Sequence, residues 1–191
     1  MAKLKSSLKN MTLSLLLISV VMSAALGFVY NITKEPISQA MKAKEINAIK
    51  VVLPSFDNDP MAFATEKNGL IFYVATKGND TIGYAAKTFT DQGYSGRFEL
   101  MVGFLPDGSI NNVVVLQQNE TPGLGSNMSK EKFVGQFIKL NIGELKDGRL
   151  KVKKDGGTID AISAATITSR AYCDALQKAF DELMKIQEGE K

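Results

Sequence analysis

The sequence has no histidine, no tryptophan and only one cysteine, Cys173. The absence of histidine excludes imidazole bases, histidine-based triads and histidine metal ligands. A lone cysteine cannot form an internal disulfide, and by itself it cannot hold a zinc ion or an iron–sulfur cluster. We therefore expect no metal site and no catalytic residue from the chain itself. A bound group is expected to carry the chemistry, with Cys173 as a small buried residue.

An excess of charge of one sign is also missing. The formal net charge is +3 over 191 residues, of which 23% are charged and 45% hydrophobic. This balance is ordinary for a globular protein and is not basic enough to indicate nucleic acid as a partner. We therefore expect no nucleic-acid partner.

One long hydrophobic run is present near the N-terminus. Met11–Tyr30 (MTLSLLLISVVMSAALGFVY) has no charged side chain, and a helix of that length spans the hydrocarbon core of a bilayer. Lys3, Lys5 and Lys9 precede this run without an acidic residue, so the positive-inside rule places residues 1–10 in the cytoplasm. We expect a single-pass protein of the bacterial inner membrane whose main domain lies on the outer, periplasmic side.

A cleaved signal peptide is the alternative interpretation of this run, because Ser23–Ala25 is a possible small-residue cleavage site. The apolar run continues past that point through Leu26, Phe28 and Tyr30. This continuation favours a retained transmembrane helix.

The rest of the chain is expected to hold a linking helix and one domain. Residues 31–54 have helical spacing of apolar side chains, with Pro36 at the first turn of the predicted helix and Pro54 at its end. Residues 55–191 are long enough for one domain with its own core.

Within this domain, period-two patterns and turn sequences predict antiparallel strands, and a helix-spaced apolar pattern predicts a final helix from Thr166 to Ile186. A short helix at Asn127–Phe137, capped by Asn127 or Ser129, and a short hairpin at Leu145–Lys153 are also expected. Together these elements predict an α+β fold, a mostly antiparallel sheet with packed helices. The four strands expected with clear turns are Leu70–Thr76, Thr81–Lys87, Phe98–Leu105 and Ile110–Gln117.

Three segments combine glycine or small residues with polar groups: Gly93–Gly96 (GYSG), Glu120–Gly125 (ETPGLG) and Asp160–Arg170 (DAISAATITSR). Each alone is explained more simply by local structure. The first fits a plain turn, the second contains a type II turn, and the third fits a helix start capped by a hydroxyl. Likewise, Lys151–Lys154 fits a solvated strand edge.

Taken together, the three segments permit a specific kind of ligand. Glycines let a flat molecule approach the backbone closely. A helix N-terminus with serine and threonine hydroxyls favours a phosphate group. Ala164 and Ala165 leave space for something bulky. The residues therefore permit a planar cofactor that bears a phosphate, without identifying it.

The same three segments, in this order behind an N-terminal span, resemble the FMN-binding domain family over essentially the whole chain. Within that family the sequence is similar to the G subunits of Rnf-type complexes. The resemblance implies that a flavin transferase attaches FMN through its phosphate to Thr166, and that Asp160 helps the transferase to recognise the motif. It further implies that the following residues form the cofactor site: Ser163, Ala164, Ala165, Thr168, Glu120, Thr121, Gly123, Leu124, Gly125, Tyr94 and Ser95.

The sequence departs from the family pattern at two places. Ala164 stands where the family usually has glycine, which restricts the backbone if the site needs a positive φ angle. Gln117, Gln118 and Asn119 stand where many relatives have a histidine before the ETPGLG segment.

The resemblance implies an electron-transfer subunit of an ion-translocating ferredoxin:NAD oxidoreductase, partnered by membrane and iron–sulfur subunits. Its redox reaction would be part of a translocase coupled to Na⁺ or H⁺ transport, with no independent catalysis by this chain. Three alternatives remain open: the equivalent FMN-carrying component of the sodium-translocating NADH:quinone oxidoreductase, a noncatalytic exported binding domain with a membrane anchor, and a stand-alone extracellular flavin reductase.

Overall fold

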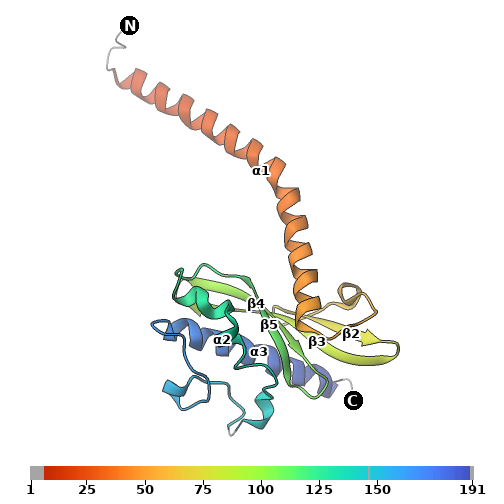
Figure 1. Ribbon diagram of the computed structural model, residues 1–191. Helices are drawn as coiled ribbons and strands as arrows, with labels where there is room; N and C mark the ends of the chain where they lie inside the picture. The colour runs from red at the N-terminus through yellow and green to blue at the C-terminus, as the bar shows by residue number, and fades with distance from the viewer. Residues whose placement is uncertain (1–6, 146, 190–191) are drawn as a thin grey trace. The chain divides into compact units, whose positions relative to one another are not determined.

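The computed structural model describes residues 7–145 and 147–189 (Figure 1). The chain divides into two compact units, one that ends at Ala43 and one that begins at Lys44. The predicted division at residues 10, 30 and 54 stays a prediction. Lys3 and Lys5, on which the expected orientation depends, lie outside the described residues.

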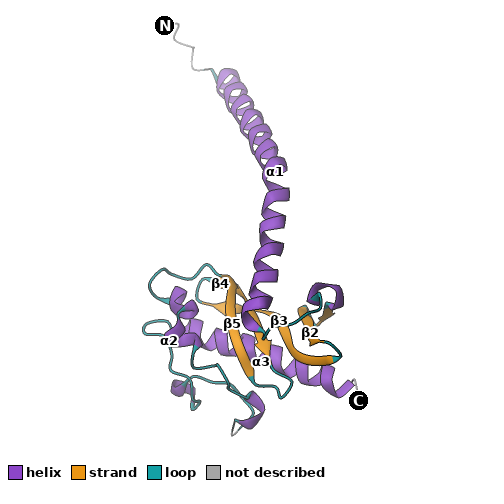
Figure 2. Ribbon diagram, turned by 45° about the vertical axis from the view of Figure 1, so that its right-hand side comes forward, coloured by secondary structure: helices purple, strands orange, loops and turns teal. Residues whose placement is uncertain are grey.

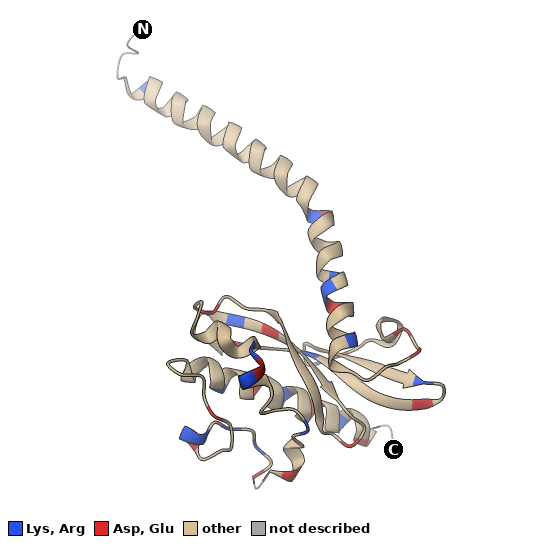
Figure 3. Ribbon diagram, viewed as in Figure 1, with Lys and Arg blue, Asp and Glu red and all other residues tan. Residues whose placement is uncertain are grey.

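Helix α1 runs from Leu8 to Val52 without a break, and Pro36 lies inside it. The prediction of a separate helix that opens at Pro36 is therefore wrong. A proline removes one backbone hydrogen bond, and the intact turns on both sides keep this long helix continuous. The apolar part of α1 has a mean hydropathy of 2.3 over an 18-residue window, and none of that window is buried. Figure 3 shows a long stretch of α1 without charged residues. By length and composition it can cross a membrane, a test that a signal sequence also passes.

Five strands form one antiparallel sheet whose order in space is the order in sequence. Strand β3 is longer than predicted because it continues through Phe89 and Thr90, which pair with Glu99 and Phe98 of the next strand. The strands are β1 (Thr65–Lys67), β2 (Leu70–Lys77), β3 (Asp80–Gly93), β4 (Gly96–Phe104) and β5 (Ile110–Gln117).

The sheet separates two hydrophobic clusters, as the alternation of side chains along the strands requires. The larger cluster includes Phe72 and Leu100 and packs against α3 (Thr166–Gly189). The smaller cluster includes Tyr73 and Met101 and is completed by Ile49, Val52 and Leu53 from the end of α1 and the residue after it. The α+β fold and the final helix, which begins at Thr166 as predicted, are confirmed.

The chain between β5 and α3 is mostly loop with short helical turns (Figure 2). Only the four residues of α2 (Glu131–Val134) are α-helical in the predicted helix Asn127–Phe137, and no side chain caps α2. Asn127 Nδ2 instead donates to the Gly123 carbonyl at 2.7 Å, and Ser129 Oγ to the Ser126 carbonyl at 3.1 Å. The other short turns are 3₁₀ helices at Pro60–Phe63, Gly125–Ser129, Ile142–Glu144 and Lys153–Asp155.

The predicted hairpin at Leu145–Lys153 is absent from the described residues. A side chain of α3 takes the place of a strand partner, because Gln177 Oε1 accepts from the Leu150 amide at 2.8 Å. Gln177 Nε2 donates to the Gly148 carbonyl at 3.2 Å. Leu150 and Val152 are both buried, so the alternation of apolar side chains marks two buried residues of a loop and not a strand of a hairpin.

Candidate functional site

The three motif segments meet at the carboxylate of Glu120, which is buried with 5% of its surface exposed. Its Oε1 accepts from the backbone amide of Ser95 at 3.0 Å. Its Oε2 accepts from Thr168 Oγ1 at 2.8 Å. One side chain thus joins the β3–β4 turn, the segment after β5 and the first turn of α3, and its two carboxylate oxygens are both satisfied.

Two glycines allow the backbone to close around this carboxylate. A Cβ atom on Gly125 would lie 2.4 Å from Glu120 Oε2, and a Cβ on Gly93 would lie 2.7 Å from Glu120 Oε1. Neither distance is possible for a real side chain. The last glycine of ETPGLG is therefore explained by close packing on Glu120, whereas a Cβ on Gly93 would first meet the backbone carbonyl oxygen of Gly96, at 2.3 Å.

The ETPGLG segment contains the predicted type II turn. The Leu124 amide donates to the Thr121 carbonyl at 3.1 Å, and Gly123 at the third position has φ +77°. The turn carries Leu124 out to the surface, where 41% of it is exposed.

The third segment turns sharply before α3 begins. The amide of Ile162 donates to Ser169 Oγ at 2.9 Å, and Ser169 Oγ donates to the Ala165 carbonyl at 2.9 Å. A serine one turn inside α3 therefore shapes the loop before the helix. Ala164, at the departure from the family pattern, has a left-handed backbone with φ +58°.

Thr166 is the first residue of α3 and is half-buried. Its Oγ1 accepts a hydrogen bond from Lys154 Nζ at 3.2 Å. The expectation that Lys151–Lys154 is a solvated strand edge is wrong for Lys154, since this residue lies in a 3₁₀ turn beside Thr166. No sequence signal distinguished Lys154 from its neighbours, because only the tertiary fold selects which lysine of the run meets the hydroxyl.

Two hollows flank this segment. The first, which we call the Thr166 pocket, has a volume of about 510 Å³, and the second, the Asp160 pocket, about 750 Å³. Both touch Leu124 and Ala164. The Thr166 pocket is lined by Tyr94, Glu120, Thr121, Leu124, Gly125, Ala164, Ala165, Thr166, Ile167 and Thr168.

The remaining predicted site residues lie at or near the Asp160 pocket or contribute through the backbone. Gly123 and Ser163 line the Asp160 pocket, and so does Asp160 itself. The Asp160 backbone is held by Gln136, which accepts from its amide at 2.7 Å and donates to its carbonyl at 3.2 Å. Ser95 lines neither pocket and contributes its amide to Glu120.

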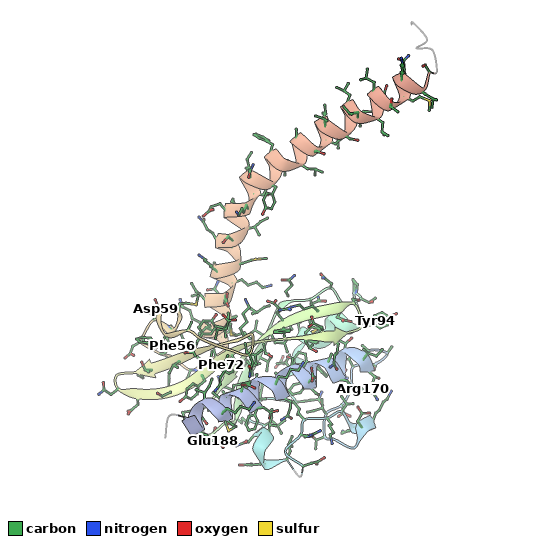
Figure 4. The ribbon with its side chains drawn as sticks, turned by 180° about the vertical axis from the view of Figure 1, so that it is seen from behind. Phe56, Asp59, Phe72, Tyr94, Arg170 and Glu188 are labelled. Carbon is green, nitrogen blue, oxygen red and sulfur yellow. The ribbon has the colours of Figure 1, made fainter. Side chains whose placement is uncertain are left out.

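The Thr166 pocket suits a flat molecule with an anionic group. Tyr94 and Ile167 leave 69% and 50% of their surfaces exposed, and with Leu124 they form an apolar rim. Tyr94 lies at the same end of the domain as Arg170 of α3 (Figure 4). The backbone amides of Thr166, Ile167 and Thr168 have no acceptor among the described residues, as expected for a helix N-terminus that can receive a phosphate. Ile167 and Gln136 are further residues of this region that the sequence did not single out.

Cys173 takes no part in this arrangement. The residue is buried, and burial raises the pKa of its thiol to about 12, so the thiolate is not formed near neutral pH. The expectation of a small buried residue is confirmed.

Comparison with known proteins agrees with this geometry. Residues 93–181, which hold all three motifs, match the model of the FMN-binding domain. The chain is 33% identical over 178 residues to the G subunit of the proton-translocating ferredoxin:NAD(+) oxidoreductase complex of Clostridium ljungdahlii, with 92% of this chain and 89% of that protein covered. It is 32% identical over 184 residues to the G subunit of the ion-translocating oxidoreductase complex of Methanosarcina acetivorans, covering 92% and 94% of the two chains.

The chain therefore belongs to the FMN-binding domain family and, within it, to the G subunits of ion-translocating oxidoreductase complexes. The crystal structure of the C subunit of the Na(+)-translocating NADH-quinone reductase from Parabacteroides distasonis shares the fold. Its TM-score is 0.50 at 21% identity, with 67% of this chain and 74% of that chain covered.

Proposed function

We propose that this chain is the FMN-carrying electron-transfer subunit of an Rnf-type complex, in which it relays electrons between membrane and iron–sulfur subunits. In this proposal the complex couples electron transfer between ferredoxin and NAD to the movement of Na⁺ or H⁺. The observation that carries the proposal is the meeting of the three motif segments on Glu120, beside the hydroxyl of Thr166. FMN, when bound, supplies one- and two-electron chemistry, while the protein supplies position and electrostatics.

The residues of the Thr166 pocket fit the two halves of FMN. The Thr166 hydroxyl would replace the nucleoside monophosphate of a flavin dinucleotide donor at the phosphorus and lose its proton, which leaves FMN joined to Thr166 as a phosphoester. The free amides at the start of α3 would donate to phosphate oxygens. Tyr94, Leu124 and Ile167 would contact the flat ring through their exposed apolar surfaces. A covalent tether would keep the cofactor on a domain outside the cytoplasm, where lost FMN is not easily recovered.

Attachment requires a flavin transferase, and we propose that this enzyme recognises the side chain of Asp160. Its carboxylate is 68% exposed and forms an ion pair with Lys153 at 2.7 Å. An Asp160→Asn variant would then be modified more slowly than the parent while keeping its fold, because an exposed surface substitution changes stability little.

We also propose that α1 is retained as a membrane anchor, with its N-terminus in the cytoplasm and the FMN domain outside. The apolar window of α1, entirely exposed, supports an anchor. Sequencing the N-terminus of the mature chain distinguishes a retained anchor, which keeps the apolar segment, from a signal peptide, which is cleaved off. A reporter enzyme that is active only outside the cytoplasm, fused after Lys191, tests the orientation.

Covalent attachment is tested by co-expressing the chain with a flavin transferase and viewing its band on a denaturing gel under ultraviolet light. We expect fluorescence in the parent and none in Thr166→Ala. Thr81→Ala, which removes an exposed threonine hydroxyl far from the motifs, is the matched control and should fluoresce like the parent.

Fluorescence that survives in Thr166→Ala would show that another residue carries the flavin. If neither protein fluoresces while the transferase labels a control substrate, the covalent-flavin proposal fails. A noncatalytic anchored domain then becomes the better account.

A further inference from the structure

Three basic side chains near the start of α3 form ion pairs. Lys153 pairs with Asp160 at 2.7 Å, and Lys151 pairs with Asp147 at 2.9 Å. Arg170 binds Asp155. Within the described part of the chain, no carboxylate lies within ion-pair distance of the Lys154 ammonium, whose hydrogen bond goes to Thr166 Oγ1 at 3.2 Å.

The turn that carries Lys154 is fixed to α3 by a two-point ion pair. Arg170 Nε and Nη2 donate to the two carboxylate oxygens of Asp155 at 2.7 and 2.6 Å. Two parallel hydrogen bonds fix both the distance and the relative orientation of the Arg170 guanidinium and the Asp155 carboxylate. Since Arg170 lies four residues after Thr166, the two share one face of the helix, and the pair places residue 154 next to residue 166.

The backbone also holds this turn in place. The amides of Gly156 and Gly157 donate to the carbonyls of Lys153 and Val152 at 3.1 Å each. A Cβ on Gly157 would lie 2.1 Å from the Lys151 carbonyl oxygen, so the loop closes tightly on itself. The backbone at Lys154 is therefore held in place by these contacts, although the Lys154 side chain is exposed.

The Lys154 ammonium thus contacts the Thr166 hydroxyl, and the first turn of α3, which begins with Thr166, has three amides without an acceptor in the described part of the chain. The amides of Thr166, Ile167 and Thr168 have no acceptor among the described residues, and the dipole of α3 adds positive potential at the same place. Asp155 attracts Lys154 only at longer range, because both of its carboxylate oxygens accept hydrogen bonds from Arg170. The arrangement is complementary to a phosphate ester at Thr166 Oγ1.

We propose that Lys154 is the phosphate-binding residue of this site and that the Asp155–Arg170 pair positions it. The inference rests on the proposed FMN site. It goes beyond that site by assigning the counter-ion of the phosphate to a residue that no motif contains. Lys154 would bind the phosphate of FMN beside the Thr166 hydroxyl and neutralise its charge.

The test compares FMN with riboflavin, which has the same ring system and lacks the phosphate. The full chain is purified in detergent without flavin, and both dissociation constants are measured by quenching of flavin fluorescence. The ratio of the riboflavin to the FMN constant isolates the phosphate contribution. We expect Lys154→Gln to lower this ratio about two- to fivefold, as for an exposed charge pair, and Lys154→Arg to keep it.

Lys151→Gln is the matched control, because this neighbouring lysine is already paired with Asp147. Its ratio should equal that of the parent. An unchanged ratio in Lys154→Gln, or an equal fall in Lys151→Gln, would overturn the assignment. A Lys154→Gln protein with unchanged circular dichroism and riboflavin affinity shows that the fall is not a folding defect.

This experiment separates the inference from the proposed covalent attachment. Binding of free FMN does not need the Thr166 hydroxyl to react, so Thr166→Ala should keep most of the phosphate contribution while losing gel fluorescence. If the parent takes up no covalent flavin yet Lys154→Gln lowers the ratio, attachment fails and the Lys154 assignment stands. If the gel shows covalent flavin and Lys154→Gln leaves the ratio unchanged, covalent attachment stands and the Lys154 assignment fails.

Discussion

Ala164 is held in a backbone conformation that suits glycine. Its φ of +58° is left-handed, and this conformation costs a residue other than glycine about 1–2 kcal/mol. Glycine would remove that strain, but it loses more conformational entropy on folding, which offsets part of the stabilisation. We expect Ala164→Gly to raise the free energy of unfolding by about 0.5–1 kcal/mol, measured by denaturant unfolding of the chain without flavin.

The matched control for this change is Ala171→Gly, because Ala171 lies inside α3 with a helical backbone. There, glycine should lower the free energy of unfolding by more than about 1 kcal/mol, because it weakens the helix and removes a methyl group from the core, where Ala171 is buried. A loss of stability in Ala164→Gly as well would contradict the view that the left-handed backbone strains this site.

Glu120 is expected to stabilise the whole motif region. Glu120→Ala leaves the buried Thr168 hydroxyl and the part-buried Ser95 amide without their acceptor. The expected loss in free energy of unfolding is about 2–3 kcal/mol, since one buried unpaired group costs about 1–3 kcal/mol and a cavity adds to it. Thermal or denaturant unfolding measures this loss.

Glu131→Ala serves as the comparison, because Glu131 is exposed at the start of α2 and should change the free energy of unfolding by less than about 0.5 kcal/mol. Equal effects of the two substitutions would mean that the Glu120 contacts add nothing. Gly125, which packs on this carboxylate, would then need another explanation.

The 3₁₀ turn Lys153–Asp155 is expected to loosen in acid. Hydrogen bonds from Arg170 hold the pKa of the Asp155 carboxyl below its usual value of 3.8. Because the folded pKa lies below the unfolded one, the pair contributes its full stability above pH 3.8. That stability is lost as the pH falls through the folded pKa.

Hydrogen exchange at the amides of Gly156 and Gly157 measures this loosening, after correction for intrinsic rates. Protection should fall below about pH 4 in the parent, whereas Asp155→Asn should show the low protection at every pH. Asp174→Asn, which changes the contacts with Lys178 and Thr90 one turn after Arg170 on α3, should keep the parent profile. If protection changes with pH in the same way in the parent and in Asp155→Asn, the Asp155–Arg170 pair does not hold this turn in place.

The elements that the sequence predicted correctly are those with local signals. The β4–β5 hairpin follows from alternation around Pro106-Asp107-Gly108, and α3 follows from apolar spacing that begins at Thr166. The hairpin predicted at Leu145–Lys153 is a loop, because the Leu150 amide donates to Gln177, which is remote in sequence. Pattern analysis has no access to such a partner.

The start of the folded domain can be decided by truncation. A chain of residues 44–191 keeps Ile49, Val52 and Leu53 in the second hydrophobic cluster, whereas a chain of residues 55–191 loses them and uncovers Tyr73 and Met101. We expect the longer fragment to unfold cooperatively as a monomer. The shorter one should be less stable by more than about 3 kcal/mol or should aggregate.

Size-exclusion chromatography and denaturant unfolding of both fragments provide the measurement. Equal stability of the two fragments would support the predicted boundary at residue 55 and would show that the end of α1 is dispensable. A stable longer fragment alone would show that the linking helix is part of the domain core.

The sequence by itself determined the apolar span, the α+β class, the three motif segments and the family, because each depends on local composition, periodicity or short patterns. Only the tertiary structure decided that Glu120 joins the three segments, that Ala164 is left-handed and that Lys154, among four adjacent residues, faces Thr166. These facts depend on contacts between residues far apart in the chain. Hydrogen-bond geometry and close packing select such contacts once the sheet and α3 are in place.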